Sequence, residues 1–113
     1  MDCIFCKIAN GTITADVVYQ NEHVTAFRDM HPQAPTHILI IPRQHFATVN
    51  DIAEKDVTVM GELLLAAKNI AATLGVAENG YRLNINTNRD GGQTVFHIHM
   101  HFMAGRSFSW PPG

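Results

Sequence analysis

The stretch Thr94-Val95-Phe96-His97-Ile98-His99-Met100-His101-Phe102-Met103 decides the fold that we expect for this chain. From His97 onward polar and apolar residues alternate, and alternate side chains of a β-strand point to opposite faces. We therefore expect the apolar residues to face a core and the three histidines to share the other face. Neighbours on one face lie about 6.5–7 Å apart. His99 is then flanked by two imidazoles, with room for a ligand atom in front of it.

Three interpretations of this histidine face stay open at this point. The face can be a solvated one that carries histidine by chance, although three histidines in register argue against chance. The imidazoles can chelate zinc, as in catalytic sites with three histidine ligands. One histidine can also act as a nucleophile or acid–base group that its neighbours hold in place. Spacing alone does not separate the last two.

Length and composition limit the class of protein. The chain has 113 residues, and we interpret residues 1–113 as one domain. A net charge of −2 supplies no cationic field for nucleic acid, and no apolar run approaches the roughly 20 residues of a membrane span. Met1-Asp2-Cys3 does not open a signal peptide. We therefore expect a cytoplasmic protein whose two cysteines are thiols or metal ligands rather than a disulfide.

Secondary structure follows from periodicity and turn signals. A short helix is expected around Ile4, Phe5 and Ile8, and a hairpin is expected over residues 17–20 and 24–28. The mostly apolar residues 36–42 predict a central strand, and residues 81–87 alternate as another. The main helix is predicted over residues 51–74, with Asp51-x-x-Glu54 as a capping box. Its core-facing stripe is predicted to be Val57, Met60, Leu64, Ala67, Ala71 and Leu74.

Several residues outside the histidine strand have both a structural and a functional interpretation. Cys3-x-x-Cys6 is half of a common zinc layout, but it also suits buried apolar residues or, least well, a redox dithiol. Asp29 ends a strand, where its carboxylate can close an Asx turn or accept hydrogen bonds from a vicinal diol such as ribose. His37, taken alone, suits a core histidine bonded to backbone.

The loop before the histidine strand and the end of the chain also have two interpretations each. Asp90-Gly91-Gly92-Gln93-Thr94 signals a hairpin turn, and its glycine amides with the Thr94 hydroxyl can also cradle an anion. Trp110 precedes Pro111-Pro112-Gly113, where it packs on its own domain or crosses a dimer interface.

Five features together resemble the histidine triad (HIT) family of nucleotide-binding hydrolases, and within it the Hint branch of purine nucleoside phosphoramidases. The likeness covers essentially the whole chain. It rests on the run from His97 to Met103, the glycine loop before it, and three further motifs, which are Pro32-Gln33-Ala34-Pro35-Thr36-His37, Ile4-Phe5-x-Lys7-Ile8 and Trp110-Pro111-Pro112-Gly113.

The resemblance implies an α+β fold with a five-stranded antiparallel sheet, one long helix and a short N-terminal helix. It implies a homodimer whose two sheets join into one of ten strands. The implied reaction is hydrolysis of the P–N bond of purine nucleoside 5′-monophosphoramidates, which gives AMP or GMP and an amine through a nucleotidyl-histidine intermediate. No cofactor is implied for catalysis, and neither nucleic acid nor membrane is a partner.

The resemblance also implies roles for individual residues. His99 is the nucleophile, His101 and His37 support it at the phosphate, and a backbone carbonyl of His97 is expected to hold the tautomer of His99. Asp29 binds the ribose hydroxyls, and Trp110 helps to select the leaving group near the partner subunit's site. The remaining nucleotide contacts are those to ribose and phosphate (Asn86, Gly92, Gln93, Thr94 and Val95) and those of the purine pocket (Phe5, Ile8, Phe27 and Met30).

A structural zinc site is implied only for those members of the family that carry the two cysteines. In them Cys3 and Cys6 are completed by a histidine after the third strand, here His45, and by His97. Such a site is closed and not catalytic. Alternation along the strand puts His97 on the catalytic face, so we expect its backbone to serve that site while its ring turns to the metal.

Two other functions remain alternatives. The chain can be a regulatory protein that binds purine nucleotides and hydrolyses them only incidentally. It can also hydrolyse dinucleoside polyphosphates, the activity of another branch of the family, although the Trp110-Pro111-Pro112-Gly113 end favours the phosphoramidase branch.

Overall fold

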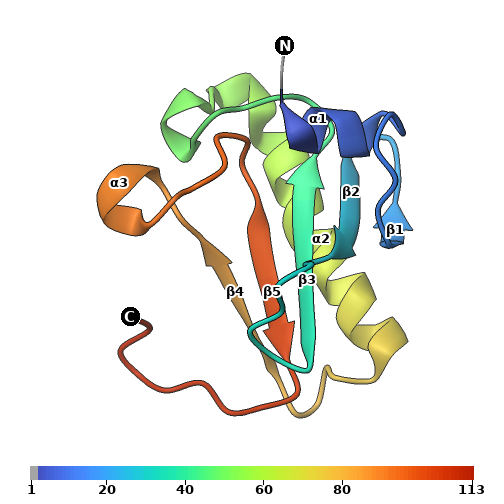
Figure 1. Ribbon diagram of the computed structural model, residues 1–113, viewed down its shortest axis with the longest axis vertical. Helices are drawn as coiled ribbons and strands as arrows, with labels where there is room; N and C mark the ends of the chain where they lie inside the picture. The colour runs from blue at the N-terminus through green and yellow to red at the C-terminus, as the bar shows by residue number, and fades with distance from the viewer. Residues whose placement is uncertain (1–2) are drawn as a thin grey trace.

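A five-stranded antiparallel sheet organises the computed structural model, which describes residues 3–113 (Figure 1). The strand order is β1-β2-β3-β5-β4, so β3 and β5 pair at the centre and β1 and β4 form the edges. This confirms the predicted α+β fold and its antiparallel sheet. The strands are β1 (Val17–Gln20), β2 (Val24–Arg28), β3 (Thr36–Pro42), β4 (Tyr81–Ile85) and β5 (Met100–Ala104).

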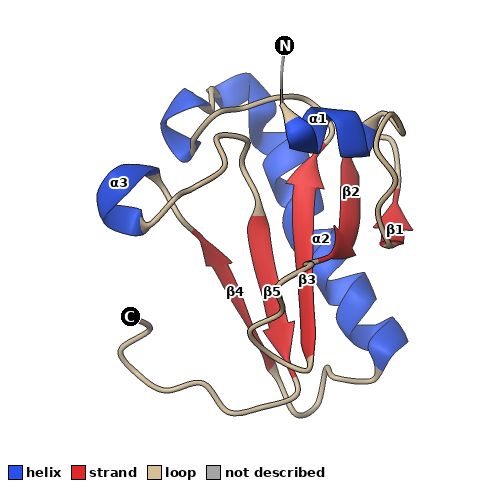
Figure 2. Ribbon diagram, in the orientation of Figure 1, coloured by secondary structure: helices blue, strands red, loops and turns tan. Residues whose placement is uncertain are grey.

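Helices cover the sheet unevenly (Figure 2). The long helix α2 (Val57–Leu74) packs on one face, where it contacts β1, β2 and β3. On the other side the short helix α1 (Ile4–Ala9) lies at one end of the sheet. A single helical turn, α3 (Asn88–Gly91), follows β4. Much of the face opposite α2 is therefore left to loops and side chains, and the histidines gather there.

The core between α2 and the sheet follows the period-two pattern of the strands. Met100, Phe102 and Ala104 of β5 point toward the helix and are buried. They meet five buried residues of α2, and full burial of each Leu, Ile or Phe side chain stabilises the fold by about 1.5–3 kcal/mol. These residues of α2 are Leu63, Ala66, Ala67, Ile70 and Ala71.

The main helix begins later than predicted. The segment before α2 forms two 3₁₀ turns, η1 (Val49–Asp51) and η2 (Glu54–Asp56). The predicted capping box Asp51-x-x-Glu54 is wrong because the Asp51 carboxylate accepts hydrogen bonds from the backbone N–H and hydroxyl of Thr48. Asp56 accepts from the N–H of Ala53 in the same way. These local side-chain bonds compete with the α-helical ladder.

The buried face of α2 is also rotated from the expected one. Val57 and Leu64 were expected in the core but are 71% and 56% exposed, whereas Leu63 and Ile70 are buried. By length and composition alone, Glu54–Leu74 is apolar enough to cross a membrane, a criterion that core helices of soluble proteins also meet. In this chain one side of α2 is buried under the sheet and the other remains exposed.

The segment around the histidines differs from the predicted strand and hairpin. β5 begins at Met100, so His97 and His99 precede it, and the expected strand over residues 81–87 ends at Ile85. The glycine loop is not a two-residue hairpin turn, because residues 88–91 form α3 and Gly92 ends that helix with a φ of +81°. A positive φ of this kind favours glycine.

Candidate active site

The pairing of β3 with β5 brings two histidines from distant parts of the sequence together. His37 is opposite Met103 and Leu39 is opposite His101, so both imidazoles lie on the face away from α2. His99 stands just before β5, and its ring centroid is 5.1 Å from that of His101. The three rings therefore form one group in which His101 is the central member.

One backbone carbonyl determines which nitrogen of His99 is available. His99 Nδ1 lies 2.8 Å from the carbonyl oxygen of His97. A carbonyl only accepts, so Nδ1 carries the proton and the neutral ring keeps a lone pair on Nε2. The ring is buried, and the edge contact of Phe5 at 5.2 Å supports it. His99 thus has the tautomer that a nucleophilic imidazole requires.

A chain of hydrogen bonds determines which ring nitrogen carries the proton in His37 and in His101. The backbone N–H of Gln33 donates to His37 Nδ1 at 3.0 Å, so a neutral His37 carries its proton on Nε2. This Nε2 lies 2.9 Å from His101 Nδ1 and donates to it. His101 therefore keeps its own proton on Nε2. The site pairs a lone pair on His99 with an N–H donor on His101.

Burial keeps the two supporting histidines neutral. It lowers the pKa of His101 to about 4, and the neighbouring His99 and His37 add to this effect. The pKa of His37 is also lowered, mainly by burial, against a smaller opposing effect of the Asp29 carboxylate. Negative charge brought to His101 by a phosphoryl group would favour its imidazolium form and raise this pKa.

The Asp29 carboxylate closes an Asx turn and also lies beside the histidine group. One carboxylate oxygen accepts a hydrogen bond from the backbone N–H of His31, which closes an Asx turn. The other lies 3.4 Å from His37 Nε2. The carboxylate is thus held at the end of β2 beside the histidine group, and an ionised carboxylate has further lone pairs for a diol.

An apolar cluster joins α1 to the histidines. Phe5 and Phe27 meet edge to face at 5.5 Å, and Ile8 packs against the same cluster. Val95 also packs there. Met30, which was expected with them, is 89% exposed and lies outside the cluster. Aromatic and aliphatic walls of this kind suit a planar, weakly polar ligand.

The loop between α3 and β5 uses several of its polar groups internally. The N–H groups of Gly92 and Gln93 donate to the carbonyls of Arg89 and Asn88, so the expected anion cradle does not include the Gly92 amide. The side chain of Gln93 is buried and donates to the carbonyls of Ala47 and Val95. The Gln93 side chain therefore fixes the conformation of the loop between α3 and β5. The exposed Thr94 hydroxyl remains the predicted donor to an anion.

Asn86 lies at the exit of β4, where its side-chain oxygen accepts a 2.7 Å hydrogen bond from Asn84. Asn84 is opposite His101 in the β4–β5 register, so this amide pair borders the histidine group. Trp110 is 84% exposed, whereas Phe108 in the same tail is half-buried. Within the protomer Trp110 therefore does not pack into a core.

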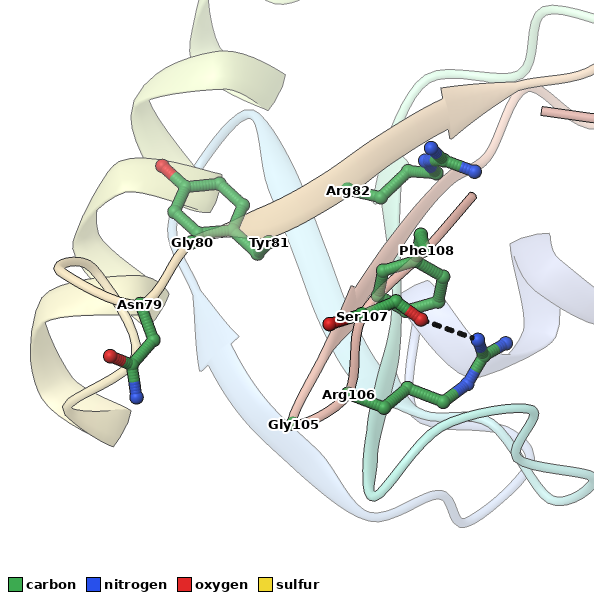
Figure 3. Close-up of a pocket in the computed structure, with 8 residues that line it drawn as sticks. All are labelled: Asn79, Gly80, Tyr81, Arg82, Gly105, Arg106, Ser107 and Phe108. Atoms are coloured by element: carbon green, nitrogen blue, oxygen red, sulfur yellow. Dashed lines mark hydrogen bonds between the residues drawn. The ribbon is translucent and has the colours of Figure 1, made fainter. Parts of the chain in front are cut away.

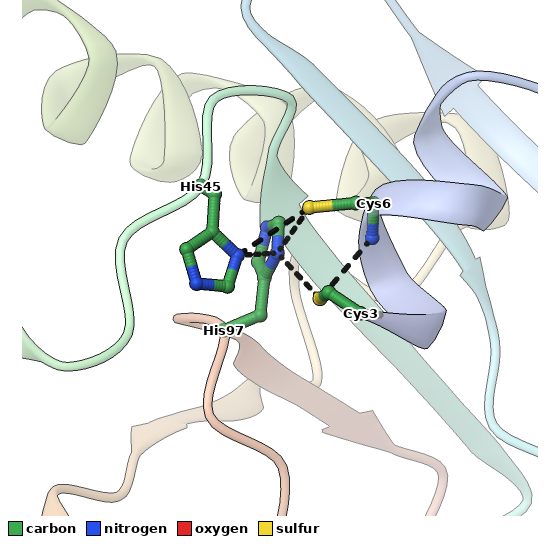
Figure 4. A group of neighbouring side chains, drawn as sticks. All are labelled: Cys3, Cys6, His45 and His97. Carbon is green, nitrogen blue, oxygen red and sulfur yellow. Dashed lines mark hydrogen bonds between the residues drawn. The ribbon is translucent and has the colours of Figure 1, made fainter. Parts of the chain in front are cut away.

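The ring of His97 points toward two cysteines (Figure 4). Its Nε2 lies 2.8 Å from the carbonyl oxygen of Pro42 and donates to it, so Nδ1 bears a lone pair. That Nδ1 is 3.3 Å from Cys3 Sγ and 3.6 Å from Cys6 Sγ. His45 completes the group, with its Nδ1 3.2 Å from that of His97 and 3.4 Å from Cys6 Sγ.

These four atoms have the spacing of a tetrahedral metal site. Bonds of 2.0–2.3 Å to zinc at tetrahedral angles separate nitrogen and sulfur ligands by about 3.3–3.8 Å. Four of the six separations run from 3.2 to 3.6 Å, and all four atoms lie within 4.8 Å of one another. Burial and the neighbouring Cys3 raise the pKa of the Cys6 thiol, and a bound cation would reverse this effect. Metal-binding histidines also commonly donate their second nitrogen to a carbonyl, as His97 does.

A single site built from three triad histidines is not what the chain forms. The His97 ring lies on the same side of the sheet as His99, since Phe5 contacts both rings, but it points toward Pro42 and the cysteines, as expected for a metal ligand. Asp29, His37 and His101 also lie close enough to hold a cation. The hydrogen-bonded chain from Gln33 through His37 to His101 already explains their arrangement.

Sequence inspection missed the groups that orient the histidines. These groups are backbone atoms, namely the N–H of Gln33 and the carbonyls of His97 and Pro42. Of these, only the His97 carbonyl was anticipated. Every residue except proline offers the same N–H and every residue the same carbonyl, so residue type carries no signal for the other two.

Comparisons with known proteins agree with this geometry. The HIT domain model matches residues 10–108. The chain is 53% identical over 105 residues to the purine nucleoside phosphoramidase of Escherichia coli K12, which covers 93% of this chain and 88% of that protein. A HIT family hydrolase from Legionella pneumophila is 51% identical with a TM-score of 0.96, over 99% of this chain and 100% of the other. A histidine triad protein from Clostridium difficile is 41% identical with a TM-score of 0.94, over 96% and 95%.

Proposed function

Because the chain belongs to the histidine triad (HIT) family, we propose that it hydrolyses purine nucleoside 5′-monophosphoramidates to the nucleoside monophosphate and an amine. The observation that carries this proposal is the arrangement of protons at the site. His99 offers a lone pair from Nε2 because the His97 carbonyl holds its other nitrogen, and His101 offers an N–H beside it. A nucleophile and an acid side by side are what substitution at phosphorus with an amine leaving group needs.

The reaction takes two displacements at phosphorus. In the first, His99 Nε2 forms a bond to phosphorus while the P–N bond breaks, and the leaving nitrogen takes a proton from His101. In the second, water attacks the nucleotidyl-histidine and gives its proton to His101, which releases the monophosphate and restores the His99 lone pair. Covalent catalysis divides one difficult step into two easier ones.

The proton supply to the leaving amine depends on the substrate itself. His101 has a pKa of about 4 in the free protein and is neutral at pH 7. The anionic phosphoryl group stabilises the imidazolium and makes proton transfer through His101 easier at neutral pH. In the neutral form of His101, His37 donates to Nδ1 and keeps the opposite nitrogen, Nε2, directed at the leaving group; in the imidazolium form Nδ1 is itself protonated and this bond is lost.

The purine nucleotide is proposed to lie across the face opposite α2. Its base would contact Phe5, Ile8 and Phe27, and its ribose diol would bind Asp29. The phosphate would meet His99, His101 and the loop at Thr94, with Asn86 nearby. The contact of Phe5 with both Phe27 and the His99 ring supports this order, because it joins the apolar cluster to the nucleophile.

We also propose that Cys3, Cys6, His45 and His97 hold a structural zinc ion. Bound zinc would cross-link α1 to the segments that follow β3 and precede β5. The lone pair on His97 Nδ1, the second hydrogen bond of that ring to Pro42 and the tetrahedral spacing support this assignment. Catalysis needs no step through the metal, because the nucleophile and acid are separate groups.

We further propose a homodimer with a continuous ten-stranded sheet. β4 is an edge strand, and an edge offers unpaired backbone groups to a second copy. The adjacent helix α2 exposes Val57, Leu64 and Leu65, while Ile85 on β4 is 39% exposed. Pairing of two β4 strands would cover these apolar side chains. The exposed Trp110 would then lie near the partner's site, where it would influence the choice of leaving group.

Cytoplasmic location and the lack of nucleic-acid or membrane partners stay predictions. The net charge of −2 and two cysteines that are free thiols among histidines support them.

Trapping of the covalent adduct tests the proposed function most directly. The protein is mixed with excess adenosine 5′-phosphoramidate, quenched within one turnover and mapped by mass spectrometry. We expect a nucleotidyl group on His99 in samples quenched early and its disappearance in samples quenched after the substrate is consumed. Hydrolysis without an adduct on any histidine, or an adduct on another residue, would contradict the mechanism.

A side-by-side assay separates the alternatives. We expect turnover of adenosine phosphoramidate to exceed that of diadenosine polyphosphate by at least about 10-fold, a difference of about 1.4 kcal/mol in the barrier. Tight AMP binding without turnover of either compound would instead identify a regulatory nucleotide-binding protein.

A further inference from the structure

A hollow of about 650 Å³ lies between the start of β4 and residues 105–108 (Figure 3). Two arginines, Arg82 and Arg106, and the ring of Phe108 line it. We propose that this hollow is the leaving-group subsite and that it selects amines bearing a carboxylate. This inference rests on the proposed phosphoramidase function and adds a substrate class to it.

The two arginines are cations without an acidic partner among the residues that the structure describes. Within residues 3–113, neither guanidinium lies within 4.0 Å of a carboxylate. Arg82 donates instead to the carbonyl of Ser109, and Arg106 donates to the carbonyls of Gln33 and Ser107. Each guanidinium has five N–H donors, so these bonds leave further donors on both. An anion entering the hollow would meet two positive charges and no competing negative one.

Phe108 holds these cations in a defined arrangement. The guanidinium carbon of Arg106 lies 4.1 Å from the ring centroid and that of Arg82 lies 5.2 Å from it. Both distances are within the range of cation–π contact. Stacking on one ring reduces the freedom of two long side chains, so less entropy is lost when they bind a carboxylate. The ring also offers an apolar wall to the carbon atoms of the leaving amine.

Strand register puts Arg82 beside the acid of the reaction. In the β4–β5 pair, Arg82 is opposite Met103 and Asn84 is opposite His101. Side chains two residues apart share a face and lie about 7 Å apart, so Arg82 is one step along from His101 on the same face. Pairing of β4 with a second copy would leave this face unchanged, because strand pairing uses backbone groups only.

Arg106 approaches the same end of the site from the other side. It donates to the carbonyl of Gln33, and the N–H of Gln33 donates to His37, the partner of His101. Gly105 explains how the chain comes so close, because a Cβ there would lie 2.8 Å from Pro35 and its φ is +98°. Both arginines therefore border the His37–His101 end of the site.

The chemistry directs the leaving group toward these arginines. The leaving nitrogen takes its proton from His101, so the group that it carries starts beside His101. Along the face, the order from His99 to His101 continues to the row of Met103 and Arg82. A carboxylate one or two carbons from the leaving nitrogen would reach this row and accept charge-assisted hydrogen bonds from guanidinium.

A matched pair of substrates tests this inference. Adenosine 5′-phosphoramidates are made with alanine, which has a free carboxylate, and with alaninamide, which has the same shape without the charge. We expect kcat/KM to favour the alanine compound by about 10- to 100-fold, as charge-assisted hydrogen bonds predict. Arg82→Gln and Arg106→Gln should each reduce this preference, and the double variant should abolish it.

Three controls keep the result interpretable. Lys55→Gln removes one exposed positive charge on η2, outside the hollow, and should keep the full preference. Arg82→Lys keeps the charge and should retain part of it. Unsubstituted adenosine phosphoramidate has no side group, so Lys55→Gln should hydrolyse it at the rate of the unmodified protein. For the arginine variants, melting curves report folding, and the preference is the ratio of the two kcat/KM values within each variant.

Equal kcat/KM for the two compounds in the unmodified protein, or a preference that survives in the double variant, would overturn the subsite. Failure of every variant and of the unmodified protein to hydrolyse the unsubstituted compound would instead overturn the proposed function.

Discussion

Two histidine groups share one side of the sheet and present their nitrogens in opposite ways. In the group of Cys3, Cys6, His45 and His97, here called the cysteine cluster, His97 donates Nε2–H to the Pro42 carbonyl. Its Nδ1 lone pair points toward Cys3 and Cys6. At the candidate active site, His99 donates Nδ1–H to the His97 carbonyl and leaves Nε2 free. The difference comes from where a backbone carbonyl lies, because the bond made by one nitrogen determines the state of the other.

His97 belongs to both groups, but with different atoms. Its ring lies in the cysteine cluster and its carbonyl orients the nucleophile. Lone pairs converge in the cysteine cluster, whereas lone pairs and N–H donors alternate through Gln33, His37 and His101. Converging lone pairs suit a cation, and alternating ones suit proton transfer. Substitutions in the cysteine cluster and substitutions at the candidate active site should therefore have separable effects.

The largest effect is expected from His99→Ala. Loss of the nucleophile should lower phosphoramidase turnover by at least about 10⁴-fold. The cysteine cluster does not involve the His99 ring, so zinc content and melting temperature should stay near those of the unmodified protein. Single-turnover kinetics, metal analysis and a melting curve check these outcomes. Residual turnover above a hundredth of the original, with His31→Ala as the control, would argue against His99 as the nucleophile.

His101→Ala should have the next largest effect, and the effect should depend on the leaving group. General acid catalysis contributes about 10²–10⁴-fold, so kcat for a phosphoramidate of a basic amine should fall by that factor. Release of p-nitrophenolate from the p-nitrophenyl ester of AMP needs no proton, so its rate should fall much less. Equal losses for the two substrates would show that His101 does not act as the acid.

Removal of the proposed zinc should affect stability more than chemistry. A ligand present at 1,000 times its Kd stabilises the folded state by about 4 kcal/mol. For a domain of about 100 residues this corresponds to a melting temperature lower by more than about 10 °C in the zinc-free protein. Cys6→Ser should lower zinc content and melting temperature, while the kcat of the remaining folded protein should change little.

Metal analysis and thermal melts with and without EDTA check this prediction. Thr12→Ser, at an exposed position after α1, serves as the matched control. A purified protein with well under one zinc per chain and a melting temperature that EDTA does not change would contradict the proposal that the cysteine cluster binds zinc.

The division between these two groups limits what sequence inspection could predict. The bounds of β1, β2 and β3 follow directly from apolar runs and turn residues, and Ile98, Met100 and Phe102 enter the core as alternation predicts. Alternation gave the side of the sheet on which His97 lies but not the direction of its ring, because His97 precedes β5, which begins only at Met100. Outside a regular strand, local hydrogen bonds decide where a side chain points.

The same reason explains the other differences. The glycine loop became a helical turn, and Asp51 and Asp56 capped 3₁₀ turns instead of the long helix. Each outcome depends on which backbone group a polar side chain or amide meets, and that pairing is set by the folded chain. Met30 was expected to line the purine pocket and is 89% exposed, in the loop that contains the Asx turn at Asp29.

The smallest effect is expected in the pH dependence of stability. The pKa of His101 is lowered to about 4 in the folded protein, whereas that of an unfolded histidine is about 6.5. Between these values the unfolded chain binds more protons, so the free energy of unfolding should fall as the pH drops from about 6.5 toward 4. The contribution of one group is at most about 1.4 kcal/mol per pH unit. His37, whose pKa is also lowered, adds in the same direction.

A comparison with His101→Gln isolates this contribution. Glutamine does not titrate, so urea unfolding from pH 7 to pH 4.5 should show a shallower loss of stability in the variant. Both proteins keep the cysteine cluster, so titration of its ligands cancels in the difference. Bound AMP should raise the pKa of His101 through the charge of its phosphate, and NMR titration of the imidazole would detect that rise. Identical slopes in the two proteins would mean that His101 is as easily protonated in the folded as in the unfolded state, and the acid of the reaction would then not need the substrate's charge.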